Sequence, residues 1–218
     1  YEEELNILDK IVKKDLESID VGVYRGVYSY KLSQLTKHVH SFEPNPFIFP
    51  YLRNNLTKII KNITLYNYAA SNKTSETNLK LPKRNKTILS KNYEEIYKMG
   101  SATIHEKNSL NNNDYEICKV KTIKLDNLLE NKKIGFIKID VEGHEKNVIE
   151  GAINIIQKNK PNLLVEIEEK HSMEKVEDTI NFINKLGYNS YYFENLKINK
   201  TINIDNFNRK NNYIFISK

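Results

Sequence analysis

Apolar residues along the chain fall into two alternating patterns. Short continuous runs, bounded by Gly, Pro, Asn or Asp, predict buried strands, and longer segments with apolar residues three or four positions apart predict amphipathic helices. The predicted strands cover residues 16–21, 39–43, 63–70, 134–141, 163–168, 188–193 and 213–216. The predicted helices cover residues 5–12, 27–35, 49–59, 145–158 and 174–186. This alternation predicts an α/β protein with a mostly parallel sheet covered on both faces.

The pattern loosens between about residues 71 and 120, where short strand-like pieces such as 77–81 stand between clusters of Lys, Asn and Ser. An insertion of this length in a compact domain is usually functional or mobile. The 218 residues, of which 39% are hydrophobic, suit one domain with a single core. We therefore expect one domain over residues 1–218, with an N-terminal helix within about residues 1–15 that covers one edge of the sheet.

The chain carries 34 Lys and Arg against 28 Asp and Glu, a formal net charge of +6. Such an excess can indicate a polyanionic partner. However, acidic residues stand between the basic ones, and no run of Lys and Arg is longer than two residues. We interpret the excess as a solvated face and expect no nucleic-acid partner.

No apolar stretch approaches the roughly 18 to 20 residues that a membrane-spanning helix needs, so we expect a soluble protein without a membrane span. The single cysteine, Cys118, cannot form an internal disulfide, and the first residues show no signal-peptide pattern. We therefore expect a reducing, cytoplasmic location. His38 and His40 share one face of a predicted strand, but no third ligand is near in sequence, so we expect no metal site. The oligomeric state is not indicated.

Ligands of open α/β sheets bind beyond the carboxyl ends of the strands, at the point where the strand order reverses. The first candidate motif lies there, with Asp20 and Gly22 after the first predicted strand and Gly26 before the next helix. Glycines at such a turn allow a ligand to approach backbone amides at a helix N-terminus. The spacing lacks the G-x-G-x-x-G pattern of dinucleotide sites, which disfavours NAD. The alternative is a strand-to-helix turn without a ligand.

The second motif is the segment 41–46, Ser-Phe-Glu-Pro-Asn-Pro, which ends the second predicted strand. Its acidic residue, Glu43, stands about 20 residues after the glycine turn, where a carboxylate commonly binds ribose hydroxyls. The alternative is a charge at a helix terminus. The glycine turn at the expected distance favours the ribose ligand.

The third motif, segment 137–145, places three carboxylates and a histidine after a buried strand: Asp140, Glu142, His144 and Glu145. Carboxylates gathered in this way, with no Lys or Arg partner apparent in the sequence, repel one another unless they bind a cation or ligand hydroxyls. An acidic helix N-terminus, favoured by the helix dipole, explains Glu145. It does not explain Asp140, which ends the buried strand.

In these three motifs the chain resembles the FkbM family of S-adenosylmethionine-dependent methyltransferases, over about residues 18–168. Members carry a D-x-G turn, an F-E-P-x-P segment and an I-K-I-D-V-E-G-x-E segment. The family's first motif usually reads Asp-x-Gly-Ala-Asn-x-Gly, whereas Val23, Tyr24 and Arg25 fill its central positions here. This departure suggests the alternative of a weakened or repurposed cofactor site.

The resemblance implies a class I methyltransferase fold, a Rossmann-like, doubly wound and mostly parallel sheet whose last strand is antiparallel. It implies S-adenosylmethionine as cofactor. The cofactor-binding residues implied are Asp20, Gly22 and Gly26 around the methionine and sugar, Glu43 at the ribose, Ala69 near the adenine and Asp140 facing the transferring methyl group.

The resemblance also implies methyl transfer to a hydroxyl of a sugar, a glycan or another small molecule, with the insertion over the acceptor. The protein mainly positions the acceptor and manages one proton. His144 has the unperturbed pKa nearest neutrality and is the candidate base, with Asp140 as an orienting alternative. We assign Glu142 and Glu166 to substrate binding. The alternative for His144 is a surface residue in the first turn of the helix, and Glu166 could equally be a solvent-facing group.

Two other functions remain open at this point. A non-catalytic binding or scaffold domain is suggested by the altered glycine turn. Nucleic-acid modification is suggested by the basic charge, but the Asn-Pro-Pro-Tyr or Asp-Pro-Pro-Tyr tetrad of many base methylases is absent from the sequence.

Overall fold

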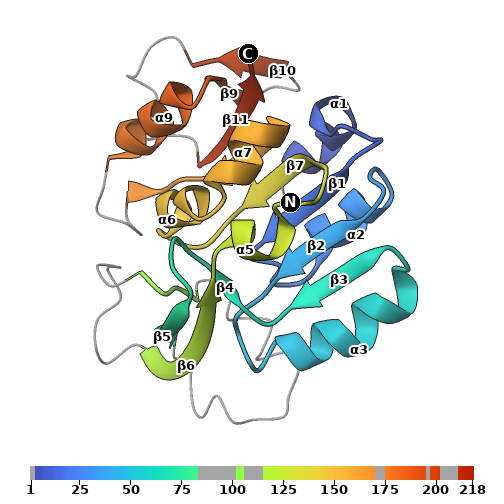
Figure 1. Cartoon of the computed structure of the whole chain (residues 1–218), viewed down its shortest axis with the longest axis vertical. Helices are drawn as coiled ribbons and strands as arrows, with labels where there is room; N and C mark the ends of the chain where they lie inside the picture. The colour runs from blue at the N-terminus through green and yellow to red at the C-terminus, as the bar shows by residue number, and fades with distance from the viewer. Residues whose placement is uncertain (1–2, 83–101, 106–114, 170–174, 195–196, 202–210) are drawn as a thin grey trace.

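The computed structural model describes residues 3–82, 102–105, 115–169, 175–194, 197–201 and 211–218. An eight-stranded sheet with the order β10-β9-β11-β8-β7-β1-β2-β3 forms its centre (Figure 1). The strands of this sheet are β1 (Glu17–Val21), β2 (Val39–Phe42), β3 (Ile63–Tyr66), β7 (Ile134–Ile139), β8 (Asn162–Glu166), β9 (Tyr188–Glu194), β10 (Lys197–Lys200) and β11 (Asn212–Ser217).

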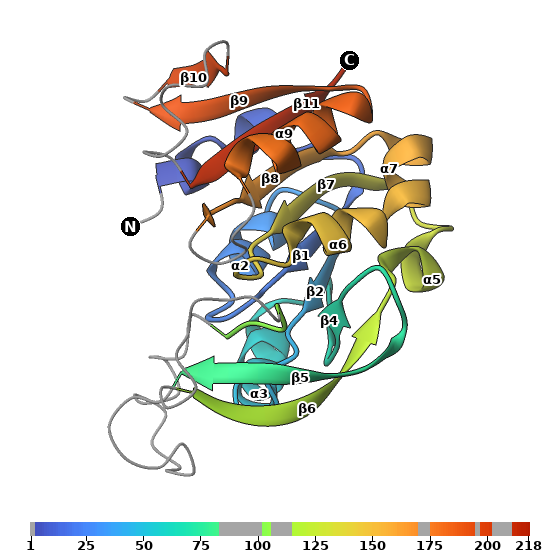
Figure 2. The same cartoon turned by 90° about the vertical axis from the view of Figure 1, so that its left-hand side faces the viewer.

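Most of the helices lie where the sequence pattern predicts them. They are α1 (Leu8–Ile11), α2 (Val27–Ser33), α3 (Phe49–Ile59), α5 (Leu125–Leu129), α6 (Glu145–Glu150), α7 (Ile153–Asn159) and α9 (Val176–Lys185), with a 3-10 turn, η1 (Glu3–Asn6), at the start. Figure 2 shows α6, α7 and α9 on one face of the sheet and α2 on the other.

Strand pairing confirms the doubly wound, mostly parallel fold. Strands β3, β2, β1, β7 and β8 are mutually parallel, and β11 pairs antiparallel with both β8 and β9. Because the chain winds outward through β2 and β3 on one side of β1 and through β7 and β8 on the other, the strand order reverses between β1 and β7. This is the place where such sheets bind ligands.

Successive side chains of β1 point to opposite faces of the sheet. Ile19 and Val21 join the large core cluster under α5, α6, α7 and α9. Ser18 and Asp20, on the other side of the strand, are also fully buried. On that side the N-terminal residues pack with Phe136 and Leu164 of the central strands. The first helix therefore covers a face of the sheet and not an edge, and it is shorter than expected.

The first and last parts of the insertion are strands that pair with each other as one hairpin. Strands β5 (Ser75–Pro82) and β6 (Tyr115–Ile123) pair antiparallel, and the short β4 (Ala69–Ala70) joins β6 in a second, three-stranded sheet. The hairpin lies beside α3 (Figure 2), and Leu79 and Leu81 share a buried cluster with Leu52 and Leu56 of that helix. The strand predicted over 63–70 is thus two strands in different sheets. Residues 83–101 and 106–114 of the insertion lie outside the described residues.

The helix predicted over 145–158 is interrupted at Gly151. A Cβ on Gly151 would lie 2.0 Å from the Ser71 carbonyl oxygen, so the chain after β4 crosses the helix at this point. The second half, α7, is capped at its N-terminus by a side chain of α5: the Asp126 carboxylate accepts the backbone N–H groups of Asn154 and Ile155, both at 3.0 Å. The pattern also did not predict α5 or β10.

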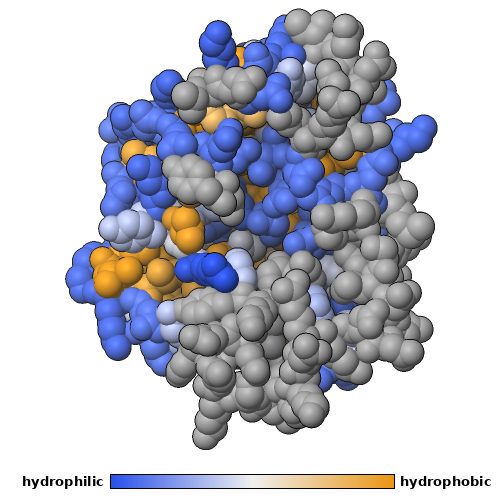
Figure 3. Space-filling view, turned by 180° about the vertical axis from the view of Figure 1, so that it is seen from behind, coloured by the Kyte–Doolittle hydropathy of each residue, from blue (hydrophilic) through white to orange (hydrophobic). Residues whose placement is uncertain are grey.

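The described surface on the face turned away in Figure 1 is mostly hydrophilic, with apolar residues in a few small areas (Figure 3). Within the described part of the chain, the exposed large apolar side chains come from five different elements: Val27, Tyr30, Ile59, Ile117, Leu128 and Ile198. Scattered apolar side chains of this kind are usual on a folded surface. Among the described residues no helix is long and apolar enough to cross a membrane.

Candidate active site

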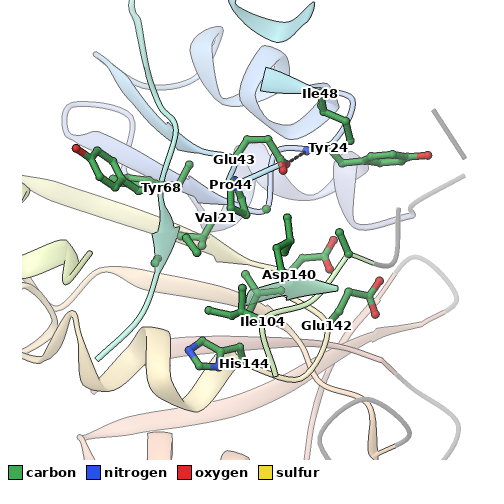
Figure 4. Close-up of a pocket in the computed structure, with 17 residues that line it drawn as sticks. Val21, Tyr24, Glu43, Pro44, Ile48, Tyr68, Ile104, Asp140, Glu142 and His144 are labelled. Carbon is green, nitrogen blue, oxygen red and sulfur yellow. Dashed lines mark hydrogen bonds between the residues drawn. The ribbon is translucent and has the colours of Figure 1, made fainter. Parts of the chain in front are cut away.

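The carboxyl ends of β1, β2 and β7 meet around a pocket with about 660 Å³ of empty space, its open mouth included (Figure 4). Six of the sequence-predicted site residues line it together: Gly22, Glu43, Ala69, Asp140, Glu142 and His144. Three others, Asp20, Gly26 and Glu166, do not line it.

The glycine turn brings β1 against the end of β7. A Cβ on Gly22 would lie 1.8 Å from the Asp140 carbonyl oxygen, and φ at Gly22 is +85°. Only glycine satisfies both conditions. Gly26, with φ +79°, starts α2 against the Leu56 side chain and so serves the turn from outside the pocket.

Glu43 connects the first two motifs. Its Oε2 accepts the backbone N–H of Tyr24 at 2.9 Å (Figure 4), and its Oε1 accepts the backbone N–H of Asn45, also at 2.9 Å. Burial raises the pKa of Glu43 to about 7, although both hydrogen bonds oppose the shift. Tyr24 has a φ of +48°, a left-handed conformation that non-glycine residues rarely adopt. The carboxyl group therefore holds the turn in shape despite the unusual residues at its centre.

Asp20 supports the turn from below. Its carboxylate accepts a hydrogen bond of 2.6 Å from the Ser29 hydroxyl, which is itself 2.8 Å from the Ser41 hydroxyl. All three side chains are fully buried, and they join β1, α2 and β2. The structure thus gives Asp20 a role in the scaffold of the turn, and the direct cofactor contact that the resemblance implies stays a prediction.

Asp140 has a cationic partner that the sequence analysis overlooked. Lys138, two positions earlier on the same side of β7, places its Nζ 3.0 Å from the Asp140 carboxylate and 3.3 Å from the Gly22 carbonyl oxygen. Glu166 ends the neighbouring strand, and the register places its carboxyl group beside that of Asp140, with which it interacts. Burial, followed by the Asp140 charge, raises the pKa of Glu166 to about 9. Glu166 therefore contacts Asp140 and not the pocket.

His144 lies at the N-terminus of α6, where it lines the pocket (Figure 4). Its Nε2 is 2.9 Å from the Ser71 hydroxyl, and its buried Nδ1 has no hydrogen-bond partner among the described residues. Burial, with smaller contributions from the charges of His105 and Lys73, lowers the pKa of His144 to about 4. The imidazole is thus neutral at physiological pH and is not a surface residue.

The far wall of the pocket was not predicted from the sequence. Tyr68, Ile48, Leu79, Ala102 and Ile104 give this wall an apolar surface. The segment 102–105 is held to the third motif by Thr103, whose hydroxyl donates to the Glu142 carbonyl oxygen at 2.7 Å. Insertion residues therefore line the site. No group of described residues has the composition of a metal site.

The sequence model of the methyltransferase FkbM domain matches residues 20–190. The chain belongs to the FkbM methyltransferase family. This assignment confirms the resemblance in the three motifs and makes S-adenosylmethionine the cofactor.

Solved structures agree on the fold. An FkbM methyltransferase from Methylobacillus flagellatus KT superposes with a TM-score of 0.59 at 16% identity, covering 93% of this chain and 44% of that one. An rRNA methylase from Streptococcus thermophilus superposes with a TM-score of 0.54 at 12% identity, covering 99% and 93%. The chain thus spans less than half of the FkbM structure. The comparison with curated proteins gave no match.

Proposed function

We propose that this chain transfers a methyl group from S-adenosylmethionine to a hydroxyl group of a sugar, a glycan or another small molecule, in the cytoplasm. The observation that carries the proposal is the pocket at the reversal of strand order, because it brings Gly22, Glu43 and Asp140 to one place from three separate motifs. This arrangement fits a nucleoside ligand that extends across β1 from a sugar to a charged end.

The pocket residues fit the parts of the cofactor. Glu43 is placed to accept ribose hydroxyls with the lone pairs that its two backbone bonds leave, and the apolar wall at Ala69 and Tyr68 suits an adenine ring. Gly22 lines the pocket beside Asp140, and we assign it to the methionine end. Bound there, S-adenosylmethionine supplies an electrophilic methyl group on a sulfonium. Asp140 and Glu142 line the same pocket and complement that positive charge.

His144 and Glu142 are the residues we assign to the acceptor hydroxyl. Neutral His144 accepts a hydrogen bond at whichever ring nitrogen carries no proton, and its bond with Ser71 fixes the ring. Its lowered pKa makes it a weak base, so we assign it the orientation of the hydroxyl first and the acceptance of its proton second. Most of the rate enhancement then comes from proximity.

The scaffold alternative depended on the unusual residues of the glycine turn. The hydrogen bond from the Tyr24 amide to Glu43 supports a working cofactor site, because the turn has its glycines at positive φ and its central amide bound. Titration calorimetry with S-adenosylmethionine and S-adenosylhomocysteine tests this. We expect micromolar binding, weakened by about tenfold or more in Glu43→Ala. A wild-type protein that binds neither ligand would support the scaffold.

The acceptor is then sought by incubation with S-adenosylmethionine and sugars, and gain of a methyl group is detected by mass spectrometry. RNA is included as a second acceptor class, because one similar structure is an rRNA methylase. Methylation of RNA, or RNA binding that falls steeply as salt is raised, would contradict the small-molecule assignment.

A further inference from the structure

Three ionisable side chains meet beneath the pocket, at the carboxyl ends of β7 and β8: Lys138, Asp140 and Glu166. In the parallel register Ile139 stands opposite Val165, so the next residues, Asp140 and Glu166, leave the two strands side by side. Asp140 lines the pocket, whereas Lys138 and Glu166 do not. The other two groups thus act on any ligand through Asp140.

Lys138 is held with little freedom. Its residue is only 4% exposed, and a buried ammonium is tolerated only where anions or dipoles replace its hydration. The Asp140 carboxylate lies 3.0 Å away, the Gly22 carbonyl oxygen 3.3 Å away, and the Tyr28 ring centroid 4.8 Å away. One ammonium therefore joins the first motif to the third at the strand-order reversal.

Glu166 approaches Asp140 from the other strand. Two adjacent carboxylates cannot both be ionised cheaply, so one of them carries a proton. The charges that act on Glu166 are those of Asp140, Glu142 and Lys138, and its register partner on β11, Asn212, is uncharged. With its pKa raised to about 9, Glu166 is mainly protonated at neutral pH, so its carboxyl group can donate a hydrogen bond to the neighbouring Asp140 side chain.

We propose that Lys138 and Glu166 are positioning residues for the methyl-transfer site, which hold the Asp140 side chain between an ammonium and a second carboxyl group. The two donors fix the direction of the Asp140 carboxylate at the pocket floor, and Lys138 also fixes the Gly22 carbonyl. The inference rests on the proposed function, since it assumes that the pocket binds S-adenosylmethionine.

The test compares Glu166→Gln with Glu166→Ala in calorimetric titrations with S-adenosylhomocysteine and S-adenosylmethionine. A glutamine keeps a hydrogen-bond donor for Asp140 and cannot ionise, so we expect it to retain most of the wild-type affinity at pH 7. Alanine removes the donor, and we expect affinity to fall by about tenfold. Equal affinity of Glu166→Ala and wild type would overturn the role of Glu166.

The pH profile is a readout that a merely structural role would not move. Above pH 9 the Glu166 carboxyl ionises, the donor is lost and two carboxylates compete for Lys138. We therefore expect wild-type affinity to fall relative to Glu166→Gln between pH 8 and pH 10. The amino group of the ligand titrates in the same region, and the comparison of the two proteins removes its effect. Parallel profiles would contradict the proposal.

Lys138→Met tests the role of the ammonium group. Because this variant leaves the Asp140 and Glu166 carboxyl groups side by side without a cation and could misfold, the double variant Lys138→Met/Glu166→Gln removes one of the two carboxyl groups. We expect both to bind at least tenfold more weakly than Glu166→Gln alone. Wild-type affinity in the double variant would overturn the role of Lys138. Failure of the proposed function is seen separately, because the wild-type protein would then bind neither ligand at any pH.

Discussion

Gly22→Ala tests whether the contact between the β1 turn and the β7 end forms the site. A Cβ at this position would lie 1.8 Å from the Asp140 carbonyl oxygen, about 1.2 Å closer than the 3.0 Å below which such contacts essentially never occur. The oxygen belongs to the backbone, so no side chain can rotate away. The strands have to separate where the Asp140 amide donates to the Val21 carbonyl oxygen at 3.0 Å.

Two costs add in this variant. Overpacking of a close backbone contact costs about 1 to 3 kcal/mol, and alanine at positive φ costs about 1 kcal/mol more. We expect Gly22→Ala to lower the free energy of unfolding by about 2 to 4 kcal/mol. Affinity for S-adenosylhomocysteine should fall by at least tenfold, because Gly22 and Asp140 both line the pocket.

Gly187→Ala is the matched control. Gly187 has a φ of +97°, close to that of Gly22, but an added Cβ there meets nothing within 4 Å. It therefore carries the backbone cost alone, and we expect a loss of about 1 kcal/mol with unchanged ligand affinity. Urea unfolding and calorimetry measure both variants. If Gly22→Ala were no less stable than Gly187→Ala and bound ligand equally well, the close approach would not shape the site.

Two further predictions concern stability. Asp126→Ala removes both acceptors at the start of α7, and urea unfolding should show a loss of about 2 to 4 kcal/mol, against less than about 0.5 kcal/mol for the exposed Asp178→Ala. Burial raises the pKa of Glu145 from 4.5 to about 7, so its stabilising contribution is complete below pH 4.5 and is lost as the pH rises through about 7. Between pH 5.5 and 8 the free energy of unfolding of the wild type should therefore fall by about 2 kcal/mol more than that of Glu145→Gln. Urea unfolding at a series of pH values measures both, and parallel pH dependences of the two proteins would contradict the prediction.

The sequence was sufficient for the features that depend on short segments. The three motifs each follow a strand that is recognisable from its apolar residues, and parallel strands bring their carboxyl ends to one edge. Gly22, Glu43 and Asp140 could therefore be placed together from their positions in the sequence alone. The antiparallel last strand followed from the family resemblance.

Contacts between distant segments were not accessible in this way. The apolar wall of the pocket comes partly from β5 and the segment 102–105, whose sequences lack a clear apolar periodicity. Pairing in the hairpin positions β5, and the Thr103 hydrogen bond positions the segment 102–105. The interruption at Gly151 was missed because the apolar spacing continues through it, while its cause is the chain near Ser71. Of the missed contacts, the one between Lys138 and Asp140 could have been predicted from the sequence, because residues two positions apart on a strand lie on the same side of it.

Glu43 shows why a family motif can tolerate unusual residues at its centre. A left-handed residue costs about 1 to 2 kcal/mol without local compensation, and asparagine, usual in the family at the position of Tyr24, adopts this conformation more readily than tyrosine. Here the Tyr24 amide is bound to a buried carboxylate on the next strand. The turn is thus specified by a contact from the second motif as well as by its own sequence. A departure in one motif is therefore weak evidence for a lost site while its partner in another motif is still present.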